Sequence, residues 1–313
     1  MVVRSLELDG ISKFYLHDVG PDSIVRWANY VRGVAAILLS KGYDLTGFDG
    51  LIHSTIPLSS GLSSSAALEV AVARLFRDLG QLDLSPVRLA QLCQKAENEF
   101  VGMNCGILDQ FTSSVGVAGC ALLLDCRDLS SHPIQLDANV TVVICDTRTR
   151  RELTGTEYPE RRMQCELGAR RLAQFNPDVR TLRDVTLKML AENQESLDPV
   201  TERRCRFIIE ENQRVLQMAA VLPTGDRKAI HQLTSASFAG ARDLYEIVSV
   251  EMERMMEAML KGEGIIGARQ AGAGFGGCMV AFVEREAVVN FSEEVRCSYR
   301  SLTGIEPQVY PVS

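Results

Sequence analysis

The chain has 313 residues, in which 33 Lys and Arg stand against 40 Asp and Glu, and its formal net charge at pH 7 is −7. This balance argues against a nucleic-acid-binding protein that depends on bulk positive charge. The longest uncharged apolar run, residues 115–124, is about half of what a helix needs to cross a bilayer, so we expect no membrane partner.

The first residues and the cysteines together indicate a compartment. Arg4, Glu7 and Asp9 stand where a secretory signal would have its apolar stretch, so no export signal is expected. The nine cysteines are scattered without a CxxC pair, which is typical of buried thiols in a reducing environment. We therefore expect a cytoplasmic protein.

Hydrophobic periodicity predicts both strands and helices in the first half of the chain. Residues 66–79 are apolar nearly all round and end at Gly80, which is typical of a helix buried on most sides. Ser85 and Pro86 are a helix cap and a first-turn proline, and Gly102 ends the helix that they open. The predicted elements are strands over 2–8 and 51–56 and helices over 22–40, 66–79 and 86–101.

The second half is expected to contain strands over 140–145, 279–283 and 308–312 and helices over 159–174, 201–222, 250–260 and 287–300. Because strands and helices do not alternate strictly, the pattern indicates an α+β fold. Turn residues cluster within 130–150, and we place a boundary there between two lobes, 1–138 and 139–313.

Residues 57–67, PLSSGLSSSAA, join a predicted strand to the buried helix and are rich in serine. Small residues let the backbone come close to an anion, and the free N–H groups and the dipole of a helix N-terminus attract negative charge. The segment lacks the lysine of a Walker A loop. It favours phosphate as a ligand, and the alternative is an ordinary serine-rich helix cap.

Glu97 stands on the apolar stripe of the predicted helix 86–101, four residues after Cys93 and four before Val101. A buried carboxylate without a partner costs several kcal/mol, which a divalent cation or an arginine would offset. Mg²⁺ takes few protein oxygens and completes its shell with phosphate and water, so Glu97 and a hydroxyl of the serine-rich segment are candidate ligands. The alternative is a glutamate that is salt-bridged or exposed.

Asp109 lies among Ile107, Leu108 and Phe111, in the first turn of an apolar helix. A carboxylate at that position can act as a base towards a substrate hydroxyl within hydrogen-bond reach. The alternative is a charge that only interacts favourably with the helix N-terminus.

Two further segments invite a functional or a structural interpretation. Residues 272–277, GAGFGG, precede a strand instead of a helix, so they do not match a dinucleotide-binding fingerprint and indicate a backbone that closely approaches another group. Tyr158 precedes a predicted helix and can pack or present its hydroxyl to a pocket. Of the nearby arginines, most are expected on a solvated face and one is able to reach a phosphate; they are Arg148, Arg150, Arg151, Arg161 and Arg162.

Four segments follow one another along the chain, PLSSGLSSSAALEVAV, AENEFVGMNCGILDQF, EYPERRMQCE and GARQAGAGFGGC. In this order they resemble the GHMP small-molecule kinases and, within them, the galactokinase subfamily, which WANYVRG at residues 27–33 also matches. The resemblance covers essentially the whole chain. It implies a two-lobed GHMP-kinase-like fold, with an N-terminal lobe similar to domain 2 of ribosomal protein S5 and a ferredoxin-like C-terminal lobe.

The resemblance implies ATP-dependent phosphorylation of the C1 hydroxyl of galactose by a monomer that uses Mg²⁺. It places the metal on the Ser65 hydroxyl and Glu97, and it makes Asp109 the acceptor of the sugar's proton. Gly106, Asp109 and Tyr158 would bind the sugar. The ATP phosphates would lie in the loop formed by Ser59, Ser60, Gly61, Leu62, Ser63, Ser64 and Ser65.

One segment of the subfamily, GR-x-N-(L/I)-(I/L)-G-E-H-x-D-Y, does not occur in these 313 residues. The resemblance therefore implies an N-terminal lobe that is incomplete, without the arginine expected beside the catalytic aspartate. Two alternatives remain. One is a kinase for arabinose, galacturonate or N-acetylgalactosamine, and the other is a galactokinase-like sensor or regulator that binds sugar and ATP with impaired catalysis.

Overall fold

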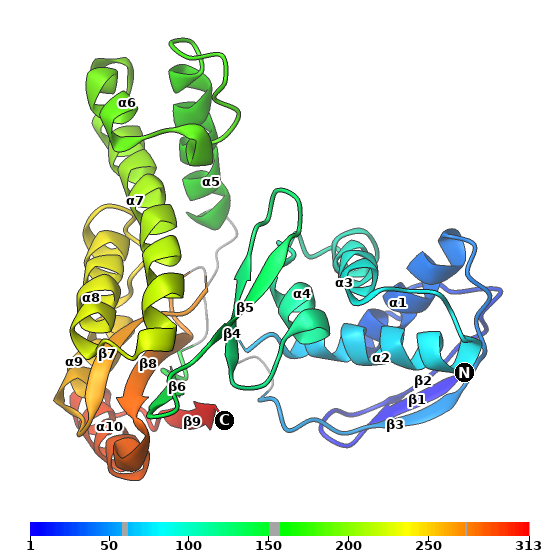
Figure 1. Cartoon of the computed structure of the whole chain (residues 1–313). Helices are drawn as coiled ribbons and strands as arrows, with labels where there is room; N and C mark the ends of the chain where they lie inside the picture. The colour runs from blue at the N-terminus through cyan, green and yellow to red at the C-terminus, as the bar shows by residue number, and fades with distance from the viewer. Residues whose placement is uncertain (58–61, 150–156, 273, 313) are drawn as a thin grey trace. The chain divides into compact units, whose positions relative to one another are not determined.

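The computed structural model describes residues 1–57, 62–149, 157–272 and 274–312, and the chain divides into two compact units, Met1–Pro133 and Ile134–Ser313 (Figure 1). Each unit contains both helices and strands, which confirms the expected α+β class. The lobe limits expected from the sequence, 1–138 and 139–313, stay a prediction.

The sheet of the first unit has three strands in the order β2-β1-β3. β1 pairs antiparallel with β2 and parallel with β3. A parallel pair requires a crossover, which here contains a short 3₁₀ turn, η1, and the helix α1. The strand expected over 2–8 and the helix expected over 22–40 are confirmed in shorter form. The strand expected over 51–56 lies earlier in the chain, at residues 49–52. The bounds are β1 (Val2–Ser5), β2 (Ile11–Lys13), η1 (Arg26–Ala28), α1 (Asn29–Ser40) and β3 (Asp49–Ile52).

Helices α1 and α2 cover one face of this sheet (Figure 1), and Val3, Val34 and Phe76 are buried where they meet. The expected helices over 66–79 and 86–101 are confirmed. The second begins at the Ser85 cap, whose hydroxyl accepts the Arg88 N–H, and it continues into a π-helical turn, η2. The remaining elements are α2 (Ser64–Gly80), α3 (Pro86–Lys95), η2 (Ala96–Val101), α4 (Leu108–Val115) and the two-stranded ribbon of β4 (Cys120–Leu124) and β5 (Ser131–Gln135).

The second unit is built on an antiparallel sheet with strand order β7-β8-β6-β9, in which Val143 lies opposite Ala281. Helices α9 and α10 pack on it through a core that includes Met255 and Phe291. The strands and helices expected over 140–145, 250–260, 279–283, 287–300 and 308–312 are confirmed. The bounds are β6 (Val140–Asp146), α8 (Arg227–Asp243), α9 (Val250–Lys261), β7 (Ile265–Gln270), β8 (Cys278–Glu284), η6 (Arg285–Ala287), α10 (Val288–Thr303) and β9 (Gln308–Val312).

A helical part of the same unit has its own core, to which Leu172, Leu182 and Cys205 contribute. Helix α5 approaches α7 closely at Gly168, where an added Cβ would lie 2.1 Å from the Cys205 Sγ. The helices expected over 159–174 and 201–222 are confirmed. The bounds are α5 (Glu157–Leu172), η3 (Leu182–Asp184), α6 (Leu187–Glu192), η4 (Gln194–Ser196), α7 (Pro199–Val221) and η5 (Leu222–Thr224).

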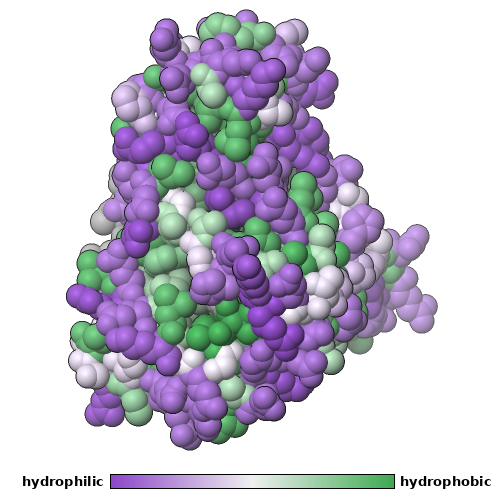
Figure 2. All heavy atoms as spheres, turned by 60° about the vertical axis from the view of Figure 1, so that its left-hand side comes forward, coloured by the Kyte–Doolittle hydropathy of each residue, from purple (hydrophilic) through white to green (hydrophobic). Residues whose placement is uncertain are grey.

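On the face drawn in Figure 2, hydrophobic side chains occur in patches between hydrophilic ones. Within the described part of the chain, no helix is both long and apolar enough to span a membrane.

Candidate active site

The N-terminus of α2 lies at the end of the serine-rich segment. Ser63 precedes the helix in a left-handed conformation, with φ of +58°, and no side chain among the described residues caps the first turn. By contrast, the hydroxyls of Ser85 and Ser249 accept N–H groups at the starts of α3 and α9. No described side chain therefore competes with an anion for the first N–H groups of α2, as the phosphate hypothesis requires. Leu62, Ser63, Ser64 and Ser65 are described, whereas Ser59, Ser60 and Gly61 lie outside the described residues.

A pocket of about 280 Å³ opens beside this helix N-terminus. Ser64 and Leu68 of α2 form one side of it, and Trp27 and Ile52 contribute apolar surface. Its polar edge is held by Glu7, whose Oε1 lies 2.5 Å from Nδ1 of His53. The pocket therefore offers a largely apolar space directly next to the candidate phosphate site.

Three side chains from α2, η2 and α4 meet and form a cluster, which we call the acidic cluster: Glu69, Glu97 and Gln110. Glu97 lies in the π-helical turn η2 and is 7% exposed, and Glu69 of α2 is fully buried. The Gln110 Nε2 of α4 donates to Oε2 of Glu97 at 2.5 Å and to Oε2 of Glu69 at 3.1 Å. Cys105 donates its thiol to the same Glu97 oxygen at 3.3 Å. A π-helical turn often marks a functional position in a helix, and here it carries the candidate metal ligand.

No described basic side chain balances the charge of the acidic cluster. Among the described residues, neither Glu69 nor Glu97 forms an ion pair with Lys, Arg or His. Burial, together with the charge of Glu97, raises the pKa of Glu69 to about 9, so Glu69 carries a proton at neutral pH. Burial and Glu97 also raise the pKa of Cys105 to about 12. The salt-bridged or exposed alternative for Glu97 therefore does not describe this residue.

Asp109 is exposed in the first turn of α4, and Gly106 is exposed just before that helix. Asp109 is the neighbour of Gln110, which contacts Glu97, so the structure brings the two acids singled out from the sequence into one neighbourhood. Ser65 stands one turn before Glu69 on α2, and residues four apart share a helix face. The acidic cluster thus links the segments that carry Ser65, Glu97 and Asp109.

The segment WANYVRG supports this arrangement from α1. A Cβ at Gly33 would lie 3.2 Å from the Cβ of Phe100, so the absence of a side chain lets α1 pack tightly against η2. Burial, and then the charges of Glu97 and Glu69, raises the pKa of Tyr30, which places its ring near the acidic cluster. Trp27 lines the pocket, and its Nε1 donates to the Asp9 carbonyl at 3.0 Å.

Comparison with known proteins identifies the family. Models of the GHMP kinases N terminal domain and the GHMP kinases C terminal match residues 29–117 and 218–301. A galactokinase of Roseiflexus sp. (strain RS-1) is 42% identical over 91% of this chain and 73% of its own length. A galactokinase of Clostridium acetobutylicum is 37% identical over 100% of this chain and 82% of its own length. The chain belongs to the galactokinase family of GHMP kinases.

Solved structures agree with this membership. The galactokinase of Lactococcus lactis, determined in complex with galactose, matches with a TM-score of 0.90 and 32% identity over 100% of this chain and 81% of that one. The mevalonate kinase of Methanococcus jannaschii, with a TM-score of 0.64 and 17% identity, shares the fold alone. The expected GHMP-kinase-like fold and kinase class are confirmed.

The second unit of this galactokinase-family chain carries the other two segments singled out from the sequence. The glycine-rich residues form the connection between β7 and β8, where Gly274 has φ of +80° and an added Cβ would lie 2.5 Å from the Ile247 carbonyl oxygen. This is the close backbone approach that the sequence indicates. Residue 273 and the side chain of Tyr158 lie outside the described structure.

The arginines near Tyr158 differ in environment. Arg161 is not on a solvated face, because its side chain is 12% exposed and its Nε donates to the Tyr245 carbonyl at 2.8 Å. Arg162 is exposed and pairs with Glu166 one turn along α5. Arg150 and Arg151 fall outside the described residues.

Sequence reasoning missed Glu69, Gln110 and the pocket. Glu69 had a signal, since it is a lone carboxylate among apolar residues, one turn after Ser65. The sequence signal for Gln110 was weaker, because it is only a polar residue next to Asp109. The sequence gives no signal for the pocket beside Ser64, because the pairing of β1 with β3 brings its walls together from distant segments.

Proposed function

We propose that this chain transfers the γ-phosphoryl group of ATP to the C1 hydroxyl of galactose and releases ADP and galactose 1-phosphate. The observation that carries the proposal is the acidic cluster, which connects α2 to the turn that carries Glu97 and to the helix that carries Asp109. Phosphoryl transfer needs an anion-binding segment, a metal carboxylate and a group that orients the attacking hydroxyl. The galactokinase relatives support galactose as the acceptor.

For ATP, we assign the phosphates to residues 59–65 and the base to the neighbouring pocket. The N–H groups at the start of α2 and the hydroxyls of Ser63, Ser64 and Ser65 would contact phosphate oxygens. The pocket beside Ser64 has the apolar surface that a purine requires, and Trp27 contributes an aromatic ring to it.

The residues present fit a divalent cation. Both hydrogen-bond donors to Glu97 contact its Oε2, which leaves Oε1 without a hydrogen-bond partner among the described residues. The Oε1 atoms of Glu69 and Gln110 are buried and have no hydrogen-bond partner among the described residues. Glu97 and the Ser65 hydroxyl would hold Mg²⁺, which neutralises phosphate charge when bound.

Asp109 is assigned as the acceptor of the proton on the sugar's C1 hydroxyl. Its exposure in the first turn of α4 leaves the carboxylate open to a substrate. Gly106, just before α4, and Tyr158 are assigned to sugar binding. A substrate hydroxyl held by Asp109 has its attacking oxygen oriented before the phosphoryl group is transferred.

Galactose-dependent release of ADP tests the proposal. We expect the chain to form ADP with galactose and to prefer it over arabinose, galacturonate and N-acetylgalactosamine. Asp109→Asn should lower the rate by roughly two to four orders of magnitude, because it removes the proton acceptor. Asp83→Asn, an exposed acid before α3, is the matched control and should leave the rate unchanged. ATP and galactose binding without ADP formation would instead support the sensor alternative.

The proposed setting is the cytoplasm. All nine cysteines are free, and four of them are buried, which suits a reducing compartment. The expected monomer stays a prediction.

A further inference from the structure

The helical part of the second unit contains a pocket that the proposed reaction does not use. It has a volume of about 510 Å³, within the usual range of small-molecule sites, and it lies between α5, residues 179–183 and α7. None of the residues assigned above to ATP, Mg²⁺ or galactose lines it. We call it the arginine-rimmed pocket.

The floor of the arginine-rimmed pocket is apolar. Ala169, Val179 and Leu182 are buried there as part of the core of this helical region, and Ile208 adds a partly buried side chain from α7. The Cys165 thiol also lines the pocket, and its burial raises its pKa, so the thiol stays neutral. A ligand would therefore meet a surface suited to an apolar ring.

The rim has the opposite character. Arg162, Arg170, Arg180 and Arg183 line the pocket, together with one acid, Glu166. Arg162 is paired with that acid at 2.9 Å. Neither Arg170 nor Arg180 has an ion-pair partner for its side chain among the described residues. In a chain with a net charge of −7, this is a local concentration of positive charge next to an apolar floor.

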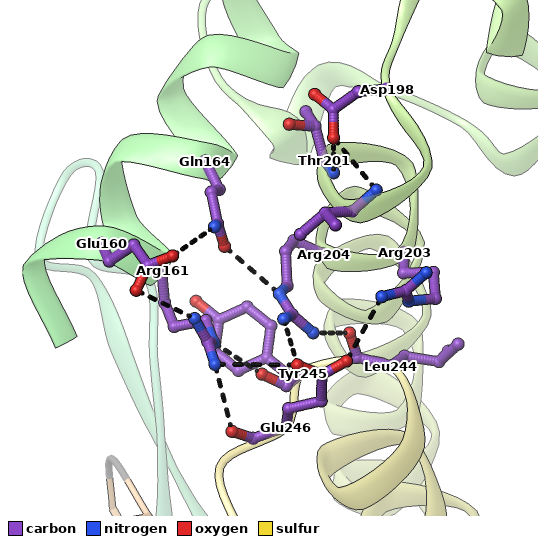
Figure 3. A network of polar contacts seen from close by, with 11 residues as sticks. Glu160, Arg161, Gln164, Asp198, Thr201, Arg203, Arg204, Leu244, Tyr245 and Glu246 are labelled. Atoms are coloured by element: carbon purple, nitrogen blue, oxygen red, sulfur yellow. Dashed lines mark hydrogen bonds and ion pairs between the residues drawn. The ribbon is translucent and has the colours of Figure 1, made fainter. Parts of the chain in front are cut away.

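One wall is held by the polar network shown in Figure 3, in which α5 and α7 converge on residues 244–246. Arg204 is 2% exposed, and it donates to the Gln164 Oε1 at 3.2 Å, to the Glu246 Oε2 at 2.6 Å and to the Leu244 carbonyl. Arg161 adds its bond to the Tyr245 carbonyl, also drawn in Figure 3.

The Tyr245 ring is fixed from its other side as well. It stacks on Phe207 with 4.8 Å between ring centroids, and its hydroxyl lies 3.6 Å from the Cys165 Sγ. Because α5 and α7 also touch closely at Gly168, the pocket is preformed and requires little ordering when a ligand binds.

We propose that the arginine-rimmed pocket binds a small phosphorylated molecule that has a flat apolar part. Arg170 and Arg180 contact the phosphate, since a guanidinium presents paired N–H groups that match phosphate oxygens. The apolar part lies on the floor beside Tyr245. The volume of the pocket suits a small molecule. Arginines beside an apolar floor favour a ligand that has both a negative charge and an apolar part over a neutral ligand.

Calorimetric titration with 1-naphthyl phosphate tests the proposal on the full chain with Mg²⁺ and galactose present in excess. We expect saturable binding of one molecule per chain. Inorganic phosphate and 1-naphthalenemethanol should each bind at least about tenfold more weakly, because each offers only half of the contacts. AMP serves as a second probe. If AMP displaces 1-naphthyl phosphate, the natural ligand of the pocket is a nucleotide.

Variants connect the binding to the pocket. Arg170→Glu and Arg180→Glu should each weaken 1-naphthyl phosphate by about tenfold or more. Arg171→Glu is the matched control, because Arg171 is exposed beside Arg170 and does not line the pocket, and it should change binding less than about twofold. All three sites are exposed, and thermal unfolding checks that the variants remain folded. Equal binding of 1-naphthyl phosphate by all three variants, or no binding of either probe, would overturn the proposal.

Discussion

Glu69 and Glu97 share a single amide donor in the interior of the first unit, and no basic side chain among the described residues pairs with either. Two ionised carboxylates in this position would each pay a desolvation cost of several kcal/mol. The protonation of Glu69, with its pKa near 9, avoids one of these costs. The remaining charge, on Glu97, is the one that a cation can offset.

The protonated Glu69 makes stability depend on pH. Its pKa rises from an ordinary value near 4.5 to about 9 on folding, so between these values the native state binds more protons than the unfolded state. This group therefore lowers the free energy of unfolding by up to about 1.4 kcal/mol for each pH unit as pH rises through that window. Glu69→Gln cannot titrate and should lose this part of the slope.

Urea unfolding in the presence of a chelator, at several pH values from 6 to 8.5, measures the effect of Glu69→Gln. Glu99→Gln, at an exposed glutamate of η2, is the control and should keep the parent slope. Identical slopes in the parent and in Glu69→Gln would show that Glu69 is ionised in the folded protein.

Glu97→Gln should reduce the effect of Mg²⁺ on ATP binding without weakening the binding of metal-free ATP. Replacing the carboxylate by an amide removes a charged oxygen ligand, so the gain in ATP affinity on adding Mg²⁺ should fall at least about tenfold. Affinity for ATP in a chelator should change little, because the start of α2 is untouched. Calorimetry with and without Mg²⁺ measures both. If Mg²⁺ raises the ATP affinity of this variant as much as that of the parent, Glu97 has only a structural role.

At the scale of elements, the π-helical turn η2 depends on its contact with α1. Gly33 faces Phe100 so closely that a Cβ would lie 3.2 Å from the Phe100 Cβ. A larger residue must push η2 away from α1, and Glu97 moves with it. The glycine of WANYVRG is thus coupled to the position of the candidate metal ligand.

Gly33→Val tests this coupling. Overpacking at the contact should destabilise the protein by about 1–3 kcal/mol and weaken the Mg²⁺-dependent part of ATP binding. Gly20→Ala, at a position with no heavy atom within 4 Å of the added Cβ, should change stability by less than about 0.5 kcal/mol. Denaturant unfolding and calorimetry measure the two effects. Full Mg²⁺-dependent affinity in a destabilised Gly33→Val would contradict the coupling.

Elements with strong local signals were predictable, and those defined by distant pairing were not. The helix after Ser85 and Pro86 has its own cap and end, and it forms as expected. The three-residue β2 is too short for a periodic pattern, and α8 contains many small and polar residues, so neither was found. In the site, the types of Glu97 and Asp109 were informative, whereas the burial of Glu69 depends on packing between α2 and α4.

At the scale of the whole molecule, the proposed residues divide unevenly between the two units. Met1–Pro133 contains the segment proposed to bind phosphate, the pocket beside Ser64, Glu97 and Asp109. Tyr158, which is proposed to bind sugar, belongs to Ile134–Ser313. The residues proposed for the nucleotide, the metal and the proton acceptor therefore all come from the first unit.

A crystal structure of the chain with Mg²⁺, a non-hydrolysable ATP analogue and galactose tests this account most directly. It should place a Glu97 carboxylate oxygen about 2.1 Å from the metal and the phosphates at the N-terminus of α2. The Asp109 carboxylate should lie about 3 Å from the C1 hydroxyl of galactose. Phosphates bound away from α2, or a sugar beyond the reach of Asp109, would contradict the central claim.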